Sequence, residues 1–266
     1  MEAGISSYTF TWAVGVPGKM PQQCMSVFDL IEKAVEYQIP VVQIADNLPL
    51  DQFSHLQLTK IKEFADKKKI KIEPGAKKMT DENLEQYIEI ACLFKSSILR
   101  FVIDGAEFHP SLDDVHQIIR NGLSSLKEKN IILAIENHDR FTAREFVSMV
   151  EKAGSNHVGI CLDTVNSMGA GEGLETVINL LAPLTVNLHV KEFSVDRVFH
   201  KMGFIIEGKP LGKGMLPLGE LLEKVNPRCQ SAILEQWTPP EKELNETIRK
   251  ESEWACQSIN YLKSIL

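Results

Sequence analysis

"IILAIENHDR", residues 131–140, places five apolar residues directly before Glu136 and four further polar side chains. A short run that is apolar at every position is typical of a strand buried on both faces. The abrupt change at Glu136 has two interpretations: a solvent-exposed turn, or a reaction site at the end of a parallel strand. The rest of the chain decides between them.

Seven other segments have the same character, being short, rich in Ile, Val and Leu, and bounded by turn residues. The eight strand candidates are residues 3–10, 40–45, 69–75, 97–104, 131–136, 158–163, 185–190 and 231–236. Between them lie amphipathic segments with apolar residues about 3.6 apart, which is typical of helices packed on a core. One example is residues 142–154, where Thr142 and Glu145 have capping-box spacing and Gly154 is a stop signal.

Eight strand candidates, each followed by a helix candidate, predict an α/β fold of the (β/α)8 TIM-barrel type. We expect residues 1–266 to form a single domain, closed by a last helix at about 240–264. A doubly wound open sheet is the rival architecture. It is disfavoured because no glycine-rich phosphate turn follows the first strand, and "GAGEG" at 169–173 lacks the GxGxxG spacing.

One connection is much longer than its neighbours. The segment "EFSVDRVFHKMGFIIEGKPLGKGMLPL", residues 192–218, separates the seventh and eighth strand candidates. Connections of this size commonly act as lids or binding segments.

Composition narrows the class of protein. The chain has 266 residues, is 44% hydrophobic and carries a formal net charge of -7, so we expect neither duplex nucleic acid nor an anionic membrane as a partner. Five cysteines without a CxxC pair indicate a reduced, cytosolic chain. The N-terminal sequence lacks the pattern of a secretory signal, and a cytoplasmic location is expected.

Four consecutive strand candidates end on a side chain that can bind a metal. They are "LAIE", "ICLD", "VNLH" and "AILE", which end at Glu136, Asp163, His189 and Glu235. In a (β/α)8 barrel these ends meet at the face that carries active sites. Three carboxylates so close together repel one another unless a cation lies between them. One such strand end would be ordinary, but four in a row favour a site for Mn²⁺ or Mg²⁺, with Co²⁺ and Zn²⁺ as alternatives.

At this level of detail the chain resembles a known superfamily. "AIENHDRF", "GICLDTVN", "LHVKEF", "GKPLGKGMLPL" and "ILEQW" are similar to the sugar phosphate isomerase/epimerase superfamily, the xylose isomerase-like TIM barrels. The superfamily includes ketose 3-epimerases, hydroxypyruvate isomerase and nucleases of the endonuclease IV type. The resemblance implies that Glu136, Asp163, His189 and Glu235 bind the metal, and that Glu136 and Glu235 form the acid/base pair.

The resemblance and the chemistry together predict a metal-dependent isomerase or epimerase of a small keto-sugar or sugar acid. The metal would bind a carbonyl and a neighbouring hydroxyl, and so stabilise the enediolate formed on deprotonation. Glu136 and Glu235 would move the protons, and epimerisation needs a carboxylate on each face.

Further residues are expected to contact the substrate. His138 and Lys191 each follow a predicted ligand by two positions and should share its side of the strand. Lys191 could bind a carboxylate or alkoxide, whereas His138 binds a substrate oxygen or caps a loop. Asn166 stands where the resembled ketose 3-epimerases carry a substrate-binding histidine, a departure that argues against a free-ketose 3-epimerase.

Three other substrate-binding candidates, Arg197, Trp12 and Glu73, could instead have a structural role. Arg197 resembles the substrate arginine of the epimerases but lies two residues further along, and it could be a surface residue. Trp12 provides an apolar wall for a sugar or belongs to the core. Arg100, inside a strand, needs an anionic partner. Glu73 is expected either to pair with it or to bind substrate.

Three other functions remain open. A lyase, either a decarboxylase or a dehydratase of a keto-sugar acid, uses the same metal-stabilised intermediate, with Lys191 and Asn166 as groups for a carboxylate. A DNA-repair nuclease needs more metal ligands than the strand ends supply, and the acidic balance opposes it. A barrel that binds a metabolite without turnover is the third. The resemblance implies a dimer or tetramer, but no segment of the sequence identifies an interface.

Overall fold

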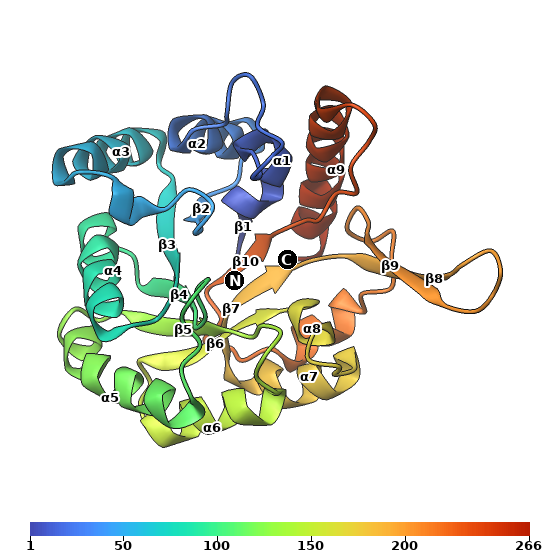
Figure 1. Cartoon of the computed structure of the whole chain (residues 1–266). Coiled ribbons are helices and arrows are strands. Elements are labelled where there is room, and N and C mark those ends of the chain that lie inside the picture. The colour runs from blue at the N-terminus through green and yellow to red at the C-terminus, as the bar shows by residue number, and fades with distance from the viewer.

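Eight parallel strands close into a barrel in the computed structural model, which describes residues 1–266. The strands follow the order β1-β10-β7-β6-β5-β4-β3-β2 around the barrel, and helices surround it (Figure 1). They are β1 (Glu2–Ser6), β2 (Val41–Ile44), β3 (Lys71–Lys77), β4 (Ile98–Val102), β5 (Ile132–Glu136), β6 (Val158–Asp163), β7 (Thr185–Val190) and β10 (Ser231–Leu234). Pairing of β1 with both β10 and β2 closes the ring, which confirms the predicted barrel and excludes the open sheet.

Each predicted strand overlaps one barrel strand, but the first was predicted to extend too far toward its carboxyl end. β1 ends at Ser6, and residues Ser7–Phe10 form the 3-10 helix η1. Ser6 Oγ accepts a hydrogen bond from the Tyr8 amide at 3.0 Å, and the Ser6 amide donates to Thr9 Oγ1 at 2.9 Å. Such local side-chain bonds compete with a strand ladder, so the backbone turns four residues earlier than its apolar character indicated.

The outer helices follow the amphipathic segments of the sequence. They are α1 (Thr11–Val14), α2 (Val27–Glu36), α3 (His55–Lys68), α4 (Asp81–Phe94), α5 (Leu112–Glu128), α6 (Ala143–Ala153), α7 (Leu174–Leu181), α8 (Leu218–Lys224) and α9 (Leu244–Ile265). In α6 the predicted capping box of Thr142 and Glu145 is present, and Gly154 ends the helix with φ 55°. None of these helices combines the length and apolar composition that crossing a bilayer requires.

The long connection after β7 contains a β-hairpin that projects from the barrel (Figure 1). β8 (Phe193–Arg197) and β9 (Phe204–Gly208) pair in antiparallel fashion. Glu192 anchors the hairpin base, because its carboxylate accepts amide hydrogen bonds from Phe193, Gly212 and Leu216 at 2.8–3.1 Å. Gly208 packs directly on the Trp237 carbonyl, where any side chain would clash. The base of the hairpin is thereby fixed beside the end of β10.

Candidate active site

The carboxyl ends of β5, β6, β7 and β10 bring four polar side chains together at one end of the barrel. Glu136 and Asp163 end β5 and β6, His189 precedes the last residue of β7, and Glu235 directly follows β10. Each is at most 1% exposed. His189 Nδ1 lies 3.3 Å from Glu136 Oε2, 3.5 Å from Glu235 Oε1 and 3.9 Å from Asp163 Oδ2. The structure therefore brings the four predicted ligands around one point.

Three buried atoms in this cluster have no hydrogen-bond partner: His189 Nδ1, Asp163 Oδ2 and Glu235 Oε2. Donor atoms of these three residues lie within 4.8 Å of one another. Unsatisfied buried polar atoms cost free energy, and one divalent cation would satisfy all three. Two carboxylates and one imidazole nitrogen suit Mn²⁺ or Mg²⁺, so the donor set fits the expected metal.

A second group of possible ligands, Glu136, Cys161 and His189, shares the same imidazole. Burial raises the pKa of the Cys161 thiol well above its usual value, and the neighbouring Glu136 carboxylate raises it further. Because the thiolate is the form that binds metals, the group of Asp163, His189 and Glu235 is the better cation site.

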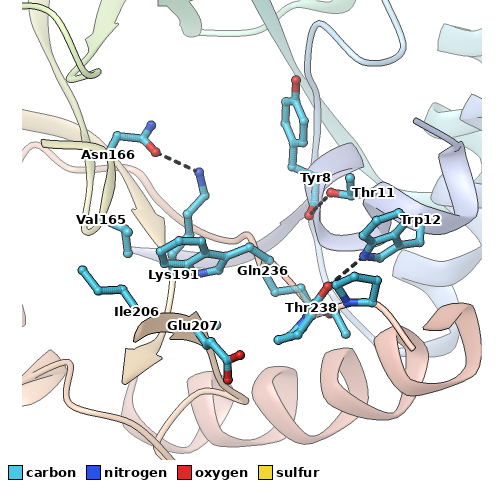
Figure 2. Close-up of a pocket in the computed structure, with 14 residues that line it drawn as sticks. Tyr8, Thr11, Trp12, Val165, Asn166, Lys191, Ile206, Glu207, Gln236 and Thr238 are labelled. Atoms are coloured by element: carbon cyan, nitrogen blue, oxygen red, sulfur yellow. Dashed lines mark hydrogen bonds between the residues drawn. The ribbon is translucent and has the colours of Figure 1, made fainter. Parts of the chain in front are cut away.

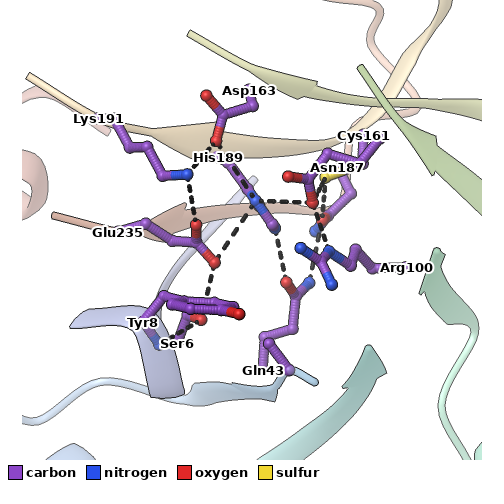
Figure 3. Close-up of polar contacts among 12 residues, drawn as sticks. Ser6, Tyr8, Gln43, Arg100, Cys161, Asp163, Asn187, His189, Lys191 and Glu235 are labelled. Atoms are coloured by element: carbon purple, nitrogen blue, oxygen red, sulfur yellow. Dashed lines mark hydrogen bonds and ion pairs between the residues drawn. The ribbon is translucent and has the colours of Figure 1, made fainter. Parts of the chain in front are cut away.

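The ammonium group of Lys191 lies against two of these carboxylates (Figure 3). Its Nζ is 2.7 Å from Asp163 Oδ2 and 3.0 Å from Glu235 Oε2, although neither contact has the angle of a hydrogen bond. Burial acts to lower the pKa of Lys191, but the attraction of the carboxylates outweighs it and raises the pKa. Lys191 therefore stays charged and points into the site.

Arg100 is the second buried cation. Its Nε donates to Glu136 Oε2, and its Nη1 donates to Asp46 Oδ1 at 2.9 Å. Burial acts to raise the pKa of Asp46, but Arg100 and Lys77 outweigh it and bring it to about 2. Four carboxylates thus face the cations of Arg100, Lys191 and the more exposed Lys77, and the cluster keeps an excess of negative charge; the carboxylates are those of Asp46, Glu136, Asp163 and Glu235.

Asn166 completes the surroundings of Glu136. Its Nδ2 donates to Glu136 Oε1 at 2.9 Å, and its Oδ1 accepts from Lys191 Nζ at 3.4 Å. Because Arg100 occupies the other oxygen of Glu136, both oxygens of this carboxylate are engaged.

Two cavities meet above the cluster. The charged chamber, about 430 Å³, is lined by Asp46, Lys77, Arg100, Glu136, His138 and Glu235, among others. The aromatic chamber, about 470 Å³, is lined by Trp12, Val165, Ile206, Trp237, Pro239 and Pro240, among others (Figure 2). Tyr8, Asn166 and Lys191 line both. The shared boundary thus has charged and polar groups on one side and apolar and aromatic groups on the other, an arrangement typical of a small-molecule site.

Comparison with known families agrees with the fold and the strand ends. Residues 34–258 match the family described as xylose isomerase-like TIM barrel. The chain belongs to this family.

The proteins that this xylose isomerase-like barrel is similar to have different names. A 3-oxo-isoapionate decarboxylase of Pectobacterium atrosepticum is 30% identical over 264 residues, which cover 98% of this chain and 95% of that protein. The structure of D-psicose 3-epimerase with D-tagatose from Clostridium cellulolyticum H10 has a TM-score of 0.74, 15% identity, and coverage of 100% of this chain and 99% of the other. A xylose isomerase-like TIM barrel protein of Mycobacterium smegmatis in complex with magnesium has a TM-score of 0.68 and 14% identity, covering 98% and 97%. The two structures support the fold alone.

Two of the predicted substrate contacts lie away from both chambers of this xylose isomerase-like barrel. Glu73 is buried in the barrel interior, where it accepts hydrogen bonds from Gln43, Asn187 and Ser231. The predicted pair of Glu73 and Arg100 is therefore wrong: Arg100, near the mouth of the barrel, reaches the carboxylates there instead.

Arg197 is the other correction. It is exposed on the hairpin, where its Nη1 donates to the Lys201 carbonyl at 2.9 Å and its guanidinium stacks 4.5 Å from the Phe204 ring. The hairpin carries it outward, because β8 leaves the barrel soon after β7 ends.

The remaining predicted contacts line the chambers. Trp12 forms part of the aromatic wall, and its Nε1 donates to the Thr238 carbonyl at 2.8 Å. His138 lies on the rim of the charged chamber with 46% of its side chain exposed, because β5 ends at Glu136 and does not carry it inward.

Four site residues were not predicted. Asp46 lies two residues after β2 in "VVQIAD" and directly after the predicted strand 40–45, so the strand-end pattern could have found it. Arg100 belongs to the site because its long side chain reaches carboxylates that follow other strands, which a sequence pattern does not show. Tyr8, which donates to Asp46 Oδ2 at 3.1 Å, and Trp237 lie in segments after strands whose course the sequence does not specify.

Glu251 in α9 connects the aromatic wall to the outer ring. Its carboxylate accepts the amide hydrogens of Trp12 and Ala13 at 2.9 and 3.0 Å. Burial raises the pKa of Glu251 to about 7, against the partial opposition of these two bonds. Between the ordinary pKa of 4.5 and this value, the folded protein holds a proton that the unfolded chain has released.

Glu251 should therefore make the protein less stable as pH rises. The unfolding free energy of the native protein relative to Glu251→Gln should fall by about 3 kcal/mol between pH 4.5 and pH 8. Urea denaturation at several pH values measures this difference. Glu253→Gln, on an exposed part of the same helix, is the control and should run parallel to the native protein. A difference between the native protein and Glu251→Gln that rises with pH would contradict the assignment.

Proposed function

We propose that the chain is a divalent-metal-dependent lyase that decarboxylates a small 3-oxo sugar acid. The observation that carries the proposal is the ammonium group of Lys191, whose side chain is 16% exposed, at the boundary of the two chambers and beside the candidate cation site. A cation in this place suits the carboxylate of a sugar acid better than the neutral hydroxyls of a free ketose. The 30% identity to a 3-oxo-isoapionate decarboxylase over almost the whole chain supports the same substrate class.

Each group would have a defined task. Asp163, His189 and Glu235 would hold a divalent cation, which supplies Lewis acidity toward the oxygen where negative charge develops. Lys191 would bind and orient the substrate carboxylate. The bond between the carboxylate carbon and its neighbour then breaks, CO₂ leaves, and the electron pair moves toward the ketone. A proton from solvent must finally reach the carbon that lost CO₂.

The state of Glu136 also favours the lyase. Decarboxylation requires delivery of a single proton, which one carboxyl group can relay from solvent. Epimerisation requires a free base on each face of the substrate, whereas Glu136 has Arg100 on one oxygen and Asn166 on the other. Glu235 also lines the charged chamber, with Ser6 Oγ donating to its Oε1 at 2.8 Å and Lys191 Nζ 3.0 Å from its Oε2.

An isomerase or epimerase of a keto-sugar is the second candidate. It is favoured by one observation: Glu136 and Glu235 both line the charged chamber, and both lie within 3.5 Å of His189 Nδ1. Release of Glu136 from Asn166 when substrate binds would give two carboxylates for proton exchange.

The two candidates give different products. We expect purified protein with Mn²⁺ to release CO₂ from 3-oxo-isoapionate or a related 3-oxo sugar acid, measured by a coupled bicarbonate assay and by ¹³C NMR. In D₂O the product should carry one deuterium on the carbon that lost CO₂. Deuterium exchange into free ketoses without CO₂ release from any acid would instead support the isomerase. If the protein catalyses neither CO₂ release from the acids nor deuterium exchange into the ketoses, the proposed function is refuted.

A further inference from the structure

A polar network lies in the barrel interior next to the candidate cation site, and Figure 3 shows three of its members, Gln43, Asn187 and His189. It consists of Gln43, Glu73, Asn187, Ser231 and the ring of His189, all buried. These side chains come from four different barrel strands, β2, β3, β7 and β10. Hydrogen bonds in a low-dielectric interior fix the orientation of these side chains, and none of them lines either chamber above.

Glu73 determines the direction of the hydrogen bonds. It accepts from Gln43 Nε2 at 3.1 Å, from Asn187 Nδ2 at 3.1 Å and from Ser231 Oγ at 2.7 Å. The second hydrogen of Gln43 Nε2 points to Asn187 Oδ1 at 3.0 Å. Both amide hydrogens of Gln43 are thus used, and its Oε1 atom faces His189 Nε2 at 2.6 Å.

The opposite orientation of the Gln43 amide is unfavourable. It would place Gln43 Oε1 against the Glu73 carboxylate and Asn187 Oδ1, which are both acceptors. Gln43 Oε1 therefore has to accept, and the only donor that reaches it is a hydrogen on His189 Nε2. In a neutral imidazole one nitrogen carries the hydrogen and the other is a bare acceptor, so His189 Nδ1 is left bare.

We propose that Gln43 and Glu73 are positioning residues that fix the tautomer of His189 before a cation arrives. The bare Nδ1 is the atom that faces Glu136, Asp163 and Glu235 and has no hydrogen-bond partner. The inference rests on the metal centre of the proposed function and adds residues to it that do not touch substrate or cation. Three carboxylates around Nδ1 would otherwise attract the hydrogen to that nitrogen and block the cation.

The experiment has a readout that requires neither metal nor activity. Long-range ¹H–¹⁵N spectra of the metal-free protein at pH 8, with His189 assigned through His189→Gln, report which ring nitrogen carries the hydrogen. We expect Nε2–H in the native protein and a shift toward Nδ1–H in Gln43→Leu and Glu73→Gln. Mn²⁺ binding, followed by calorimetry, should weaken about 10–100-fold in both variants.

Controls separate positioning from general damage to the core. Thr185→Val removes a buried hydroxyl from β7 that bonds only the Leu181 carbonyl, and it should leave the tautomer and the Mn²⁺ affinity unchanged.

Some outcomes would overturn the inference. One is a hydrogen on Nδ1, or on both ring nitrogens, of His189 in the native protein at pH 8. The other is an unchanged tautomer and an unchanged Mn²⁺ affinity in Glu73→Gln. Because glutamine is close to glutamate in shape, Glu73→Gln keeps the inference testable even if Gln43→Leu does not fold. Failure of the proposed function has a different signature: the native protein would bind none of Mn²⁺, Mg²⁺, Co²⁺ and Zn²⁺, while its spectrum still reports the tautomer.

Discussion

Asp163→Asn should abolish metal-dependent activity while leaving the fold intact. Asp163 Oδ1 accepts the amide hydrogens of Val165 and Asn166 at 2.8 and 2.9 Å, and the asparagine oxygen can keep both bonds. The other oxygen, which has no hydrogen-bond partner and pairs only with the Lys191 ammonium, becomes an NH₂ group that cannot bind a cation. Since changes outside the ligand shell already cost about 10–100-fold in metal affinity, this one should exceed about 100-fold.

Activity should fall about 10³-fold, because Lewis-acid stabilisation contributes several kcal/mol. The measurements are Mn²⁺ titration by calorimetry and initial rates before and after treatment with EDTA and resupply of Mn²⁺. Asp66→Asn, in an exposed pair with Lys62, is the matched control and should behave like the native protein. Full activity of Asp163→Asn with undiminished Mn²⁺ affinity would refute the candidate metal site.

Lys191→Met should destabilise the metal-free protein and impair turnover. The change leaves the buried carboxylates of Asp163 and Glu235 without their cation, and breaking a buried pair costs about 3–5 kcal/mol. Saturating Mn²⁺ should recover most of this loss, because the metal neutralises the same two carboxylates. Urea denaturation with and without Mn²⁺ measures both contributions.

The turnover of Lys191→Met tests whether Lys191 binds the substrate carboxylate. Loss of a buried partner for the substrate carboxylate should lower kcat/KM by about 10²–10³-fold, with KM raised. Lys213 is exposed and lies in the segment after β9. Lys213→Met is the control and should change neither kcat/KM nor KM. If Lys191→Met keeps the native stability without metal and the native KM, Lys191 neither balances the cluster nor binds substrate.

The barrel was predictable because its strands are buried on both faces, which leaves an unbroken apolar signature in a single sequence. The meeting of the four candidate ligands was predictable for a related reason: strand ends in a parallel barrel must meet, so position along the chain specifies position in space. The partner of Arg100 was mispredicted because its long side chain reaches across strands to Glu136 and Asp46, and no periodicity encodes that reach.

The aromatic chamber could not be predicted from the sequence. Its walls combine Trp12 after β1, Trp237 after β10 and Ile206 from the hairpin, and no pattern links these segments. The hairpin itself was expected only as a long connection, because its turn lacks the short Asn-Gly type of signal. The tautomer of His189 likewise depends on hydrogen bonds among four strands, which only the folded arrangement defines.

The β8–β9 hairpin, which forms one side of the aromatic chamber, has a consequence for how proteins of this fold diverge. Ile206, Glu207 and Gly208 close one side of the aromatic chamber, yet they belong to an insertion that contributes no strand to the barrel and none of the candidate ligands. Exchange or trimming of this one segment would resize the entrance for a longer or bulkier acid without altering the chemistry below. The segment is therefore a natural place to begin when engineering this scaffold toward new substrates.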